Sequence, residues 1–363
     1  MGTRRLNLKN DADFKLWNDL VESSRTPDVY YRPGYSRAYE MAGQGRVGAL
    51  LVESGTVRAL LPLLFRELPE TCLMAGEAFT DALTPYGYGG LMLAGDSEQP
   101  SLDQVVALLT ELQKWCREND VVSIYVRLHP LLRQERWLNI EGNPDFDLHR
   151  LTQTIGLDLS NWDEERHNVS TLSKGRRSDL KYARRLLRLS WASERSTHAR
   201  DLRIFREIYE GRMTEIGASD FYHFSEEYYS ALLEGLGDAL DICIAWKGEE
   251  PVGAALFMTD RVNAHYHLSA SSPLGRECKA TTMILNAAAG MARSKGCRYL
   301  HLGGGATPGD TLAAFKESFG GDVFEYFTLG IVADRAQYNE FVRRSNEKQG
   351  HSSAAYFFPA YRA

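Results

Sequence analysis

The order of secondary structure predicted for the second half of the chain restricts the fold most. Apolar residues recur there either with the helical period or with the alternation of a strand. Helices are predicted over residues 199–217, 225–237 and 278–296, and strands over 241–260 (a hairpin), 262–271 and 298–304. The order is therefore two helices, a hairpin, a strand, a long helix and a final strand. Such an order is typical of an α/β domain in which helices flank a mixed central sheet.

The first half of the chain repeats part of this order. Helices are predicted over 11–24 and 101–120, a hairpin over 46–67 and a strand over 121–130. Ser101 is the expected N-cap of the second of these helices. With 363 residues, of which 44% are hydrophobic, the chain is long enough for two cores. We expect an N-terminal domain over 1–160 and a C-terminal domain over 161–363, whose tail is a candidate to pack back on the first.

Composition argues against several classes of protein. No run reaches the roughly 20 apolar residues of a membrane helix, and the first residues lack the apolar core of a secretory signal. The five cysteines are scattered and never spaced as Cys-x-x-Cys, so neither disulfides nor a zinc site are predicted. His265 and His267 would need a third ligand such as His301 to bind a metal, and no metal site is predicted. We expect a cytoplasmic protein with buried thiols.

Charge is distributed unevenly along the chain. The net charge of −6 argues against a protein that coats nucleic acid without specificity. Residues 174–188 nevertheless hold seven basic residues and one acid, a local charge of +6, which leaves −12 for the rest. Four of the basic residues fall on one helical face, namely Arg177, Lys181, Arg184 and Arg188. This face is either an ordinary solvated surface or a contact for phosphate groups.

A glycine-rich stretch, LGGGATPGD, follows the last predicted strand. Gly304 and Gly309 have the spacing of a phosphate-binding loop, but Asp310 stands where that loop requires lysine. Asp310 is instead expected to cap the next helix, where its carboxylate would occupy the position that a bound phosphate needs. These two features argue against a phosphate-binding loop.

That following helix carries a lysine in an unusual position. Leu312, Phe315 and Phe319 are expected to share its apolar face, and Lys316 lies on the shoulder of that face. The lysine is either an amphipathic side chain whose stem covers apolar surface or a cation held at a reaction site.

The segments that surround this helix resemble the FemABX family of aminoacyl-tRNA-dependent aminoacyltransferases. The specific part is LHLGGG followed by D-x-L-x-x-F-K-x-x-F, and HYHLSASS precedes it. TPYGYGG, VRLHP and FFPAYR are similar to a wider, GNAT-related branch, so the resemblance extends from about Asp28 to Tyr361. It implies two tandem GNAT-like domains. It also implies transfer of an amino acid from a tRNA ester to an amine, without a cofactor.

The resemblance also implies roles for individual residues. Lys316 would be catalytic, stabilising the oxyanion that develops when an amine attacks the ester. Substrate contacts are expected from Tyr86, Tyr88, Arg127, Tyr222, His223, Tyr266, His267, Gly304 and Phe315. Contacts with tRNA phosphates are expected from Arg176, Arg177, Lys181 and Arg184. Without the resemblance, Tyr86 and Tyr88 would be surface tyrosines of a turn, and Tyr266 would be a core residue.

The main alternative is an acyl-CoA-dependent N-acyltransferase. GNAT enzymes bind the CoA pyrophosphate with backbone amides of a small-residue loop before the long helix. The corresponding segment here, 275–281, begins with a suitable Arg276 but has Lys279 and Thr281 in place of small residues. A non-catalytic protein that kept the fold is a third interpretation, which the presence of Lys316 disfavours.

The acceptor is expected to be an amine of a peptidoglycan precursor or of a natural product. The family often carries an arginine in the segment that matches GRMTEIGA, where this chain has Glu215 or Ile216. Arg212 is close but shifted, which weakens the case for a UDP-linked precursor.

Overall fold

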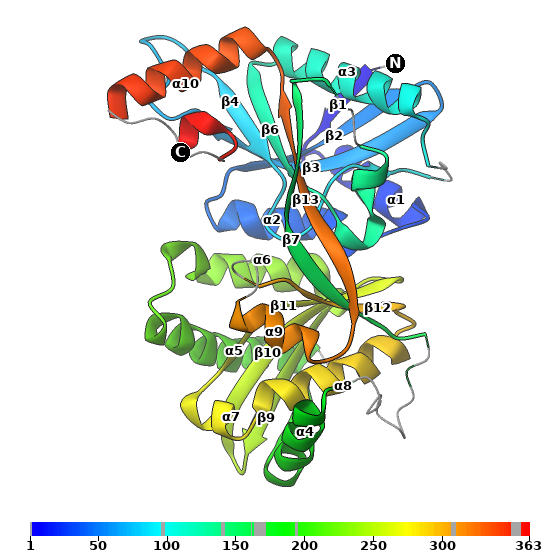
Figure 1. Cartoon of the computed structure of the whole chain (residues 1–363), viewed down its shortest axis with the longest axis vertical. Coiled ribbons are helices and arrows are strands. Elements are labelled where there is room, and N and C mark those ends of the chain that lie inside the picture. Colours follow the sequence, from blue (N-terminus) through cyan, green and yellow to red (C-terminus); the bar gives the residue numbers. More distant parts are fainter. Residues whose placement is uncertain are drawn as a thin grey trace. The chain divides into compact units, whose positions relative to one another are not determined.

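The chain divides into two compact units. A computed structural model describes residues 2–95, 99–138, 142–160, 162, 172–192, 195–305, 310–349 and 357–363. The first unit comprises Met1–Leu151 and Glu325–Ala363, and the second comprises Thr152–Phe324 (Figure 1). Each unit contains a mixed sheet with helices packed against it, as the α/β fold class predicted from the sequence requires.

The sheet of the first unit has the strand order β1-β2-β3-β4-β6-β13, and the short β5 pairs with β3. Its strands are β1 (Gly2–Leu6), β2 (Arg46–Ser54), β3 (Val57–Glu67), β4 (Thr80–Leu83), β5 (Met92–Leu93), β6 (Val121–Arg127) and β13 (Asp322–Val332). Its helices are α1 (Asp11–Ser23), α2 (Pro33–Met41), α3 (Leu102–Glu118) and α10 (Arg335–Gln349), with short 3₁₀ turns that include η1 (Val29–Tyr31) and η6 (Ala360–Arg362). Ser101 caps α3 in a capping box with Gln104, which confirms the predicted N-cap.

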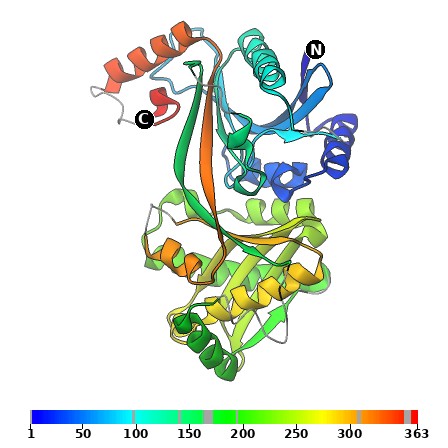
Figure 2. The same ribbon diagram turned by 45° about the vertical axis from the view of Figure 1, so that its right-hand side comes forward.

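The sheet of the second unit has the order β7-β12-β11-β10-β9-β8. Its strands are β7 (Phe146–Asp158), β8 (Arg188–Trp191), β9 (Leu240–Lys247), β10 (Glu250–Thr259), β11 (Asn263–Ser271) and β12 (Tyr299–Gly303). Its helices are α4 (Lys174–Leu186), α5 (Arg195–Glu215), α6 (Glu226–Leu236), α7 (Pro273–Glu277), α8 (Ala280–Ser294) and α9 (Thr311–Glu317). Helix α4 packs against α8 in both views (Figures 1 and 2).

The two sheets repeat one topology. A parallel pair lies in each, β4 with β6 and β11 with β12, and the long helix α3 or α8 connects the two strands of the pair. A hairpin, β2–β3 or β9–β10, precedes each pair. The strand that closes each sheet follows the other parallel pair in the chain, because β13, which comes after β12, pairs with β6, and β7, which comes after β6, pairs with β12. The duplication predicted from the element order is therefore present, with the closing strands exchanged.

This exchange places the unit boundary differently from the expected split at 160/161. Residues 325–363 follow the second unit in sequence but pack with the first. Strand β13 supplies the pairing, with Ile331 opposite Ile124. The C-terminal turn supplies a buried Tyr361, whose hydroxyl lies 2.8 Å from Oγ of Ser123.

The core of the second unit forms between α8 and one face of its sheet. Ile284, Ala288 and Ala292 recur at helical spacing on the buried side of α8 and pack with Ala255 and Phe257 of β10. Small alanines let the helix lie close to the sheet. All five cysteines are buried and free, as expected.

Helix α4 is shorter than the sequence pattern indicated. It ends at Leu186, and Arg188 belongs to strand β8. The prediction that Arg188 continues the basic helical face was therefore wrong, because the chain turns to an extended conformation at Leu187. In the described part of the chain, no helix combines the length and apolarity needed to cross a bilayer.

Candidate functional site

Lys316 lies inside the second unit near the end of the short helix α9. Only 7% of its surface is exposed. Its Nζ donates a hydrogen bond to the carbonyl oxygen of Gly304 at 2.6 Å, and it lies 5.8 Å from the centre of the Tyr266 ring. The ammonium is thus held between the end of β12 and the aromatic ring of a β11 residue.

The glycines before α9 make this arrangement possible. A Cβ atom on Gly304 would lie 2.6 Å from the carbonyl oxygen of Gln153, and one on Gly305 would lie 2.2 Å from the Asp310 carboxylate. Gly309 lies outside the described residues. Asp310 caps α9 by accepting a hydrogen bond from the backbone N–H of Ala313 at 2.7 Å. The capping prediction is therefore confirmed, and the carboxylate occupies the helix start where a phosphate would need to bind.

Burial changes the acid–base behaviour of Lys316. Loss of water around the ammonium lowers the pKa of Lys316 to about 8, and the negative charge of Asp310 partly opposes this decrease. The lysine is therefore mostly charged at pH 7 but titrates close to the physiological range. Perturbed lysines of this kind are common at functional sites.

The buried face of α9 differs from the predicted one. Leu312 is 43% exposed, whereas Lys316 and Phe319 are 7% and 2% exposed. The expectation that Leu312 shares the apolar face was wrong, because the buried stripe runs through Lys316 and Phe319, three residues apart. The apolar pattern of the sequence predicted that Lys316 lies at the edge of the buried face. In the structure its side chain instead lies on the buried face of α9.

Arg176 on α4 supports the ring next to Lys316. Its guanidinium carbon lies 4.8 Å from the centre of the Phe315 ring. Its Nη1 donates to the hydroxyl of Thr282 on α8 at 2.9 Å, and Asp179 lies 3.1 Å away. Arg176 thus ties three helices together beside the lysine. No sequence pattern indicated Thr282, since this contact joins residues far apart in the chain.

Tyr266 and His267 contact opposite sides of the sheet. Tyr266 packs with the core that includes α8 and Phe315, and burial raises its pKa to about 12. His267 lies 2.8 Å from the hydroxyl of Tyr228 on α6, and burial together with His265 lowers its pKa to about 3. Only Tyr266 of these two predicted substrate residues therefore lies against Lys316. A bulge in β11 opposite Leu256 and Phe257 occurs at this point of the strand.

Tyr222 and His223 lie on the connection between α5 and α6. Tyr222 packs edge-on against Phe221, and Nδ1 of His223 lies 2.9 Å from a carboxylate oxygen of Glu210. Within the described residues, no hydrogen bond or ring contact joins either of them to Lys316. Their predicted substrate role therefore stays a prediction.

The predicted substrate residues of the first unit form a cluster of their own. Arg127 lies 5.0 Å from the Tyr125 ring centre and 5.9 Å from that of Tyr86. Tyr88 contacts the rings of Tyr30 and Tyr326 edge-on. The glycine-rich turn is thus held in an aromatic cluster, which differs from the exposed-turn alternative for Tyr86 and Tyr88.

The basic residues of α4 divide into two groups. Lys181 and Arg184 are exposed, and the buried side of α4 consists of Leu180 and Ala183. Arg177 is half-buried and donates to the backbone carbonyl of Leu172 at 2.8 Å. The structure thus leaves a charged outer face on α4, whereas Arg176 belongs to the Lys316 surroundings.

The start of α8 is already engaged by the chain itself. Lys279 precedes the helix in a left-handed conformation, with φ of 61°. The hydroxyls of Ser271 and Thr281 lie 3.0 Å apart, and α7 fills the connection from β11. A Cβ atom on Gly275 would meet the carbonyl oxygen of Val252 at 1.9 Å, so α7 is pressed against β10.

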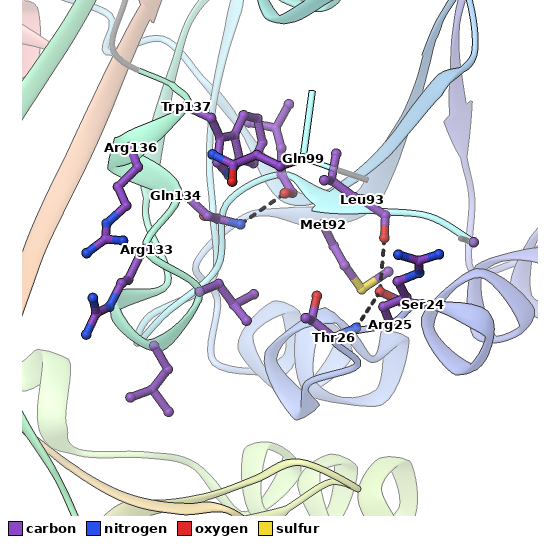
Figure 3. A pocket seen from close by; sticks show the side chains of 14 residues that line it. Ser24, Arg25, Thr26, Met92, Leu93, Gln99, Arg133, Gln134, Arg136 and Trp137 are labelled. Atoms are coloured by element: carbon purple, nitrogen blue, oxygen red, sulfur yellow. Dashed lines mark hydrogen bonds between the residues drawn. The ribbon is translucent and has the colours of Figure 1, made fainter. Parts of the chain in front are cut away.

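A cavity of about 540 Å³ lies in the first unit, and none of the predicted site residues lines it. Gln134 points into it and donates to the carbonyl oxygen of Leu91 at 2.9 Å (Figure 3). The guanidinium groups of Arg133 and Arg136 lie at its rim and point away from its centre (Figure 3). Arg25, Arg133 and Arg136 are the charged residues among those that line the cavity, and it lies in a different unit from Lys316.

Comparison with known proteins links the second unit to acyl transfer. Residues 173–317 match the model of an acetyltransferase (GNAT) domain. The match begins at the N-cap of α4 and ends one residue after Lys316. No curated protein sequence matches the chain.

Solved structures share the fold over most of the chain. FemX matches with a TM-score of 0.64 at 12% identity, covering 93% of this chain and 99% of that one. The C-terminal domain of a protein named as a putative lysylphosphatidylglycerol synthetase from Agrobacterium fabrum matches with a TM-score of 0.55 at 13% identity, covering 90% and 92%. L-PGS from Bacillus licheniformis matches with a TM-score of 0.51 at 12% identity, covering 90% and 93%. At these identities the likeness establishes the fold, and with the family match it supports a GNAT-related acyltransferase.

Proposed function

We propose that this protein transfers an aminoacyl group from an aminoacyl-tRNA to an amine and thereby forms an amide bond. The observation that carries the proposal is the buried ammonium of Lys316, held against Gly304 and the Tyr266 ring. An aminoacyl ester is already activated, so the reaction needs only positioning and stabilisation of charge. The fold shared with FemX is in keeping with this chemistry.

The reaction balances without a cofactor. The amine nitrogen attacks the ester carbonyl carbon, a C–N bond forms, and negative charge develops on the carbonyl oxygen. The bond to the ribose oxygen then breaks, and the proton that the amine loses ends on that oxygen. Lys316 is proposed as the catalytic residue that stabilises the oxyanion. An ammonium has three N–H groups, and among the described residues one of them is used by Gly304.

Two features of the second unit favour tRNA over CoA as the donor. The start of α8 carries a side chain at Lys279 and a hydroxyl pair at Ser271 and Thr281, where a CoA pyrophosphate would need bare backbone amides. The outer face of α4 carries Lys181 and Arg184, which suit a phosphate backbone. We place the reaction in the cytoplasm, where charged tRNA is made.

The matched domain model favours a second candidate, an acyl-CoA-dependent N-acyltransferase acting at the same lysine. In that reaction the amine attacks a thioester, and the thiol of CoA is the leaving group. Calorimetry separates the two donors. On the tRNA hypothesis, the purified protein should not bind acetyl-CoA at submillimolar concentration.

The decisive experiment measures the donor directly. Purified protein is incubated with a pool of charged tRNAs and candidate amines, and loss of each aminoacyl ester is followed with time. Faster discharge that depends on both protein and amine supports the proposal. If the protein binds acetyl-CoA at micromolar concentration and discharges no tRNA, it is an acyl-CoA-dependent N-acyltransferase instead.

A further inference from the structure

A cavity of about 310 Å³ in the first unit is built from one face of the sheet and from the C-terminal segment. Its volume lies at the lower end of the range for small-molecule sites. Leu83, Tyr125 and Arg127 line it from β4 and β6, and Thr328 lines it from β13. Register places these side chains side by side, with Leu83 opposite Tyr125 and Arg127 opposite Thr328. The C-terminal segment closes it with Phe358 and its neighbours.

Two of its arginines are fixed by one buried carboxylate. Asp81 is fully buried and accepts from Nε of Arg66 at 2.9 Å and from Nη2 of Arg66 at 3.2 Å. Nε and Nη2 of Arg362 also donate to Asp81, the latter at 3.2 Å. The hydroxyl of Tyr361 donates to the same carboxylate at 3.2 Å. Both guanidinium groups are therefore held in place before any ligand binds.

Each of these guanidinium groups keeps N–H donors that a ligand can use. An arginine has five N–H groups, and the contacts with Asp81 leave Nη1 of Arg66 and of Arg362 without an acceptor among the described residues. Arg127 uses Nη1 to donate to the carbonyl oxygen of Thr84 at 2.9 Å. Its Nη2 has no acceptor in the described part of the chain.

The charges do not cancel within the site. Three arginines line the cavity. Among its described lining residues, one is acidic, namely Asp147. With the buried Asp81 included, three positive charges face two negative ones, which leaves one positive charge. A ligand with one negative charge would neutralise the site, whereas a dianion would overcompensate it. Planar guanidinium forks suit carboxylate and phosphate oxygens.

The remaining walls are apolar and aromatic. The rings of Tyr125 and Phe358 stack with centres 6.2 Å apart. A Cβ atom on Gly330 would lie 2.7 Å from the Phe358 ring, so glycine at this position lets the ring rest on the sheet. Leu83 and Leu151 complete an apolar side.

We propose that this cavity binds a small amphipathic monoanion, with its carboxylate or phosphodiester at the arginines and its apolar or aromatic body against Tyr125 and Phe358. The sequence resemblance marked Arg127 for substrate contact. In this proposal Arg127 binds the anionic group of the ligand. The proposal concerns the first unit alone, so it does not depend on the donor used at Lys316.

The test compares two probes of nearly the same size and shape, of which only one is charged. Phenylacetate and its neutral analogue phenylacetamide are titrated into the full chain by calorimetry. The wild type should bind phenylacetate roughly tenfold or more tightly than the amide, the effect of one charge-assisted hydrogen bond. Methyl phenyl phosphate is the third probe. The tighter of the two anions identifies the anionic group of the ligand.

Variants locate the binding. Arg127→Gln should bring the ratio between phenylacetate and phenylacetamide close to one. Arg58→Gln should keep it, since Arg58 lies on β3 but pairs with Glu53 at the surface. If Arg127→Gln does not fold, Arg127→Lys takes its place, and it should prefer phenylacetate but bind it more weakly than the wild type. Equal binding of the two probes by the wild type would overturn the proposal, as would undiminished phenylacetate binding by the Arg127 variant that folds.

Discussion

Replacing Lys316 by methionine separates its catalytic role from its structural role. Methionine covers the same apolar wall and removes the charge. At pH 7 the native protein holds a buried ammonium, and the decrease of the pKa of Lys316 from 10.5 to about 8 corresponds to about 3 kcal/mol of unfavourable free energy. Loss of the hydrogen bond to Gly304 costs about 1–3 kcal/mol in the other direction. The free energy of unfolding at pH 7 should therefore change little, by about 2 kcal/mol at most.

The pH dependence of stability gives a sharper signature. Between pH 8 and 10.5 the unfolded chain keeps the lysine proton, whereas the folded chain releases it. Because the unfolded state binds more protons, the stability of the wild type should rise with pH across this window. Lys316→Met should lack this rise. The free energy of unfolding of both proteins is measured with denaturant at pH 7 and at pH 10. Subtracting the change in the variant from the change in the wild type cancels the contribution of the other titrating groups.

Activity should respond very differently from stability. Loss of one oxyanion donor typically lowers the rate 10²–10³-fold, so single-turnover transfer by Lys316→Met should fall by about that factor. In the wild type the rate should fall above pH 8 as the ammonium deprotonates. Lys247→Met, which makes the same change at an exposed lysine of β9, serves as the control. A normal rate in Lys316→Met would refute the catalytic role, and a wild type without the rise in stability would refute the burial argument.

Two further predictions concern neighbours of this site. Asp310→Asn keeps the oxygen that caps α9 but removes the charge that raises the lysine pKa. The falling limb of the pH–rate profile should therefore shift to lower pH, and an unshifted limb would exclude Asp310 as the charge that Lys316 senses. Removal of the charged outer face of α4 should weaken tRNA binding and flatten its log–log salt dependence by roughly one unit for each phosphate that the face no longer neutralises. The variant is the double alanine substitution of Lys181 and Arg184, which leaves the half-buried Arg177 and its hydrogen bond to Leu172 in place. A salt slope equal to that of a control Arg343→Ala, on α10 of the first unit, would make this face an ordinary solvated surface.

Local features of the sequence predicted local structure well. The caps at Ser101 and Asp310 and the hairpin over 46–67 depend on residues close together in the chain, and all three are present. The two α/β units follow from periodicity, which reports burial of one face. The sequence suggested that the C-terminal tail packs on the first domain, but the pairing partners of β7 and β13 could not be predicted, because strand pairing depends on partners far away in the sequence.

The contacts between side chains around the candidate sites could not be predicted for the same reason. Asp81 meets Arg362 across 281 positions of sequence, and Arg176 meets Thr282 across 106. No periodic pattern reports such pairs. The inward direction of Lys316 was also missed, because the helix ends within two turns and its neighbours at Gly304 and Tyr266 come from separate strands.

The exchange of closing strands has a consequence for how the chain matures during synthesis. The second unit occupies one continuous segment, 152–324, and is complete once that segment has been made. The first unit must wait for residues 325–363, although most of it is made first. Until then, strand β6 has no partner on the side that β13 later covers. An apolar strand with an open edge invites pairing with other chains, so aggregation during translation should concentrate at Val121–Arg127 and cease when the last segment is in place.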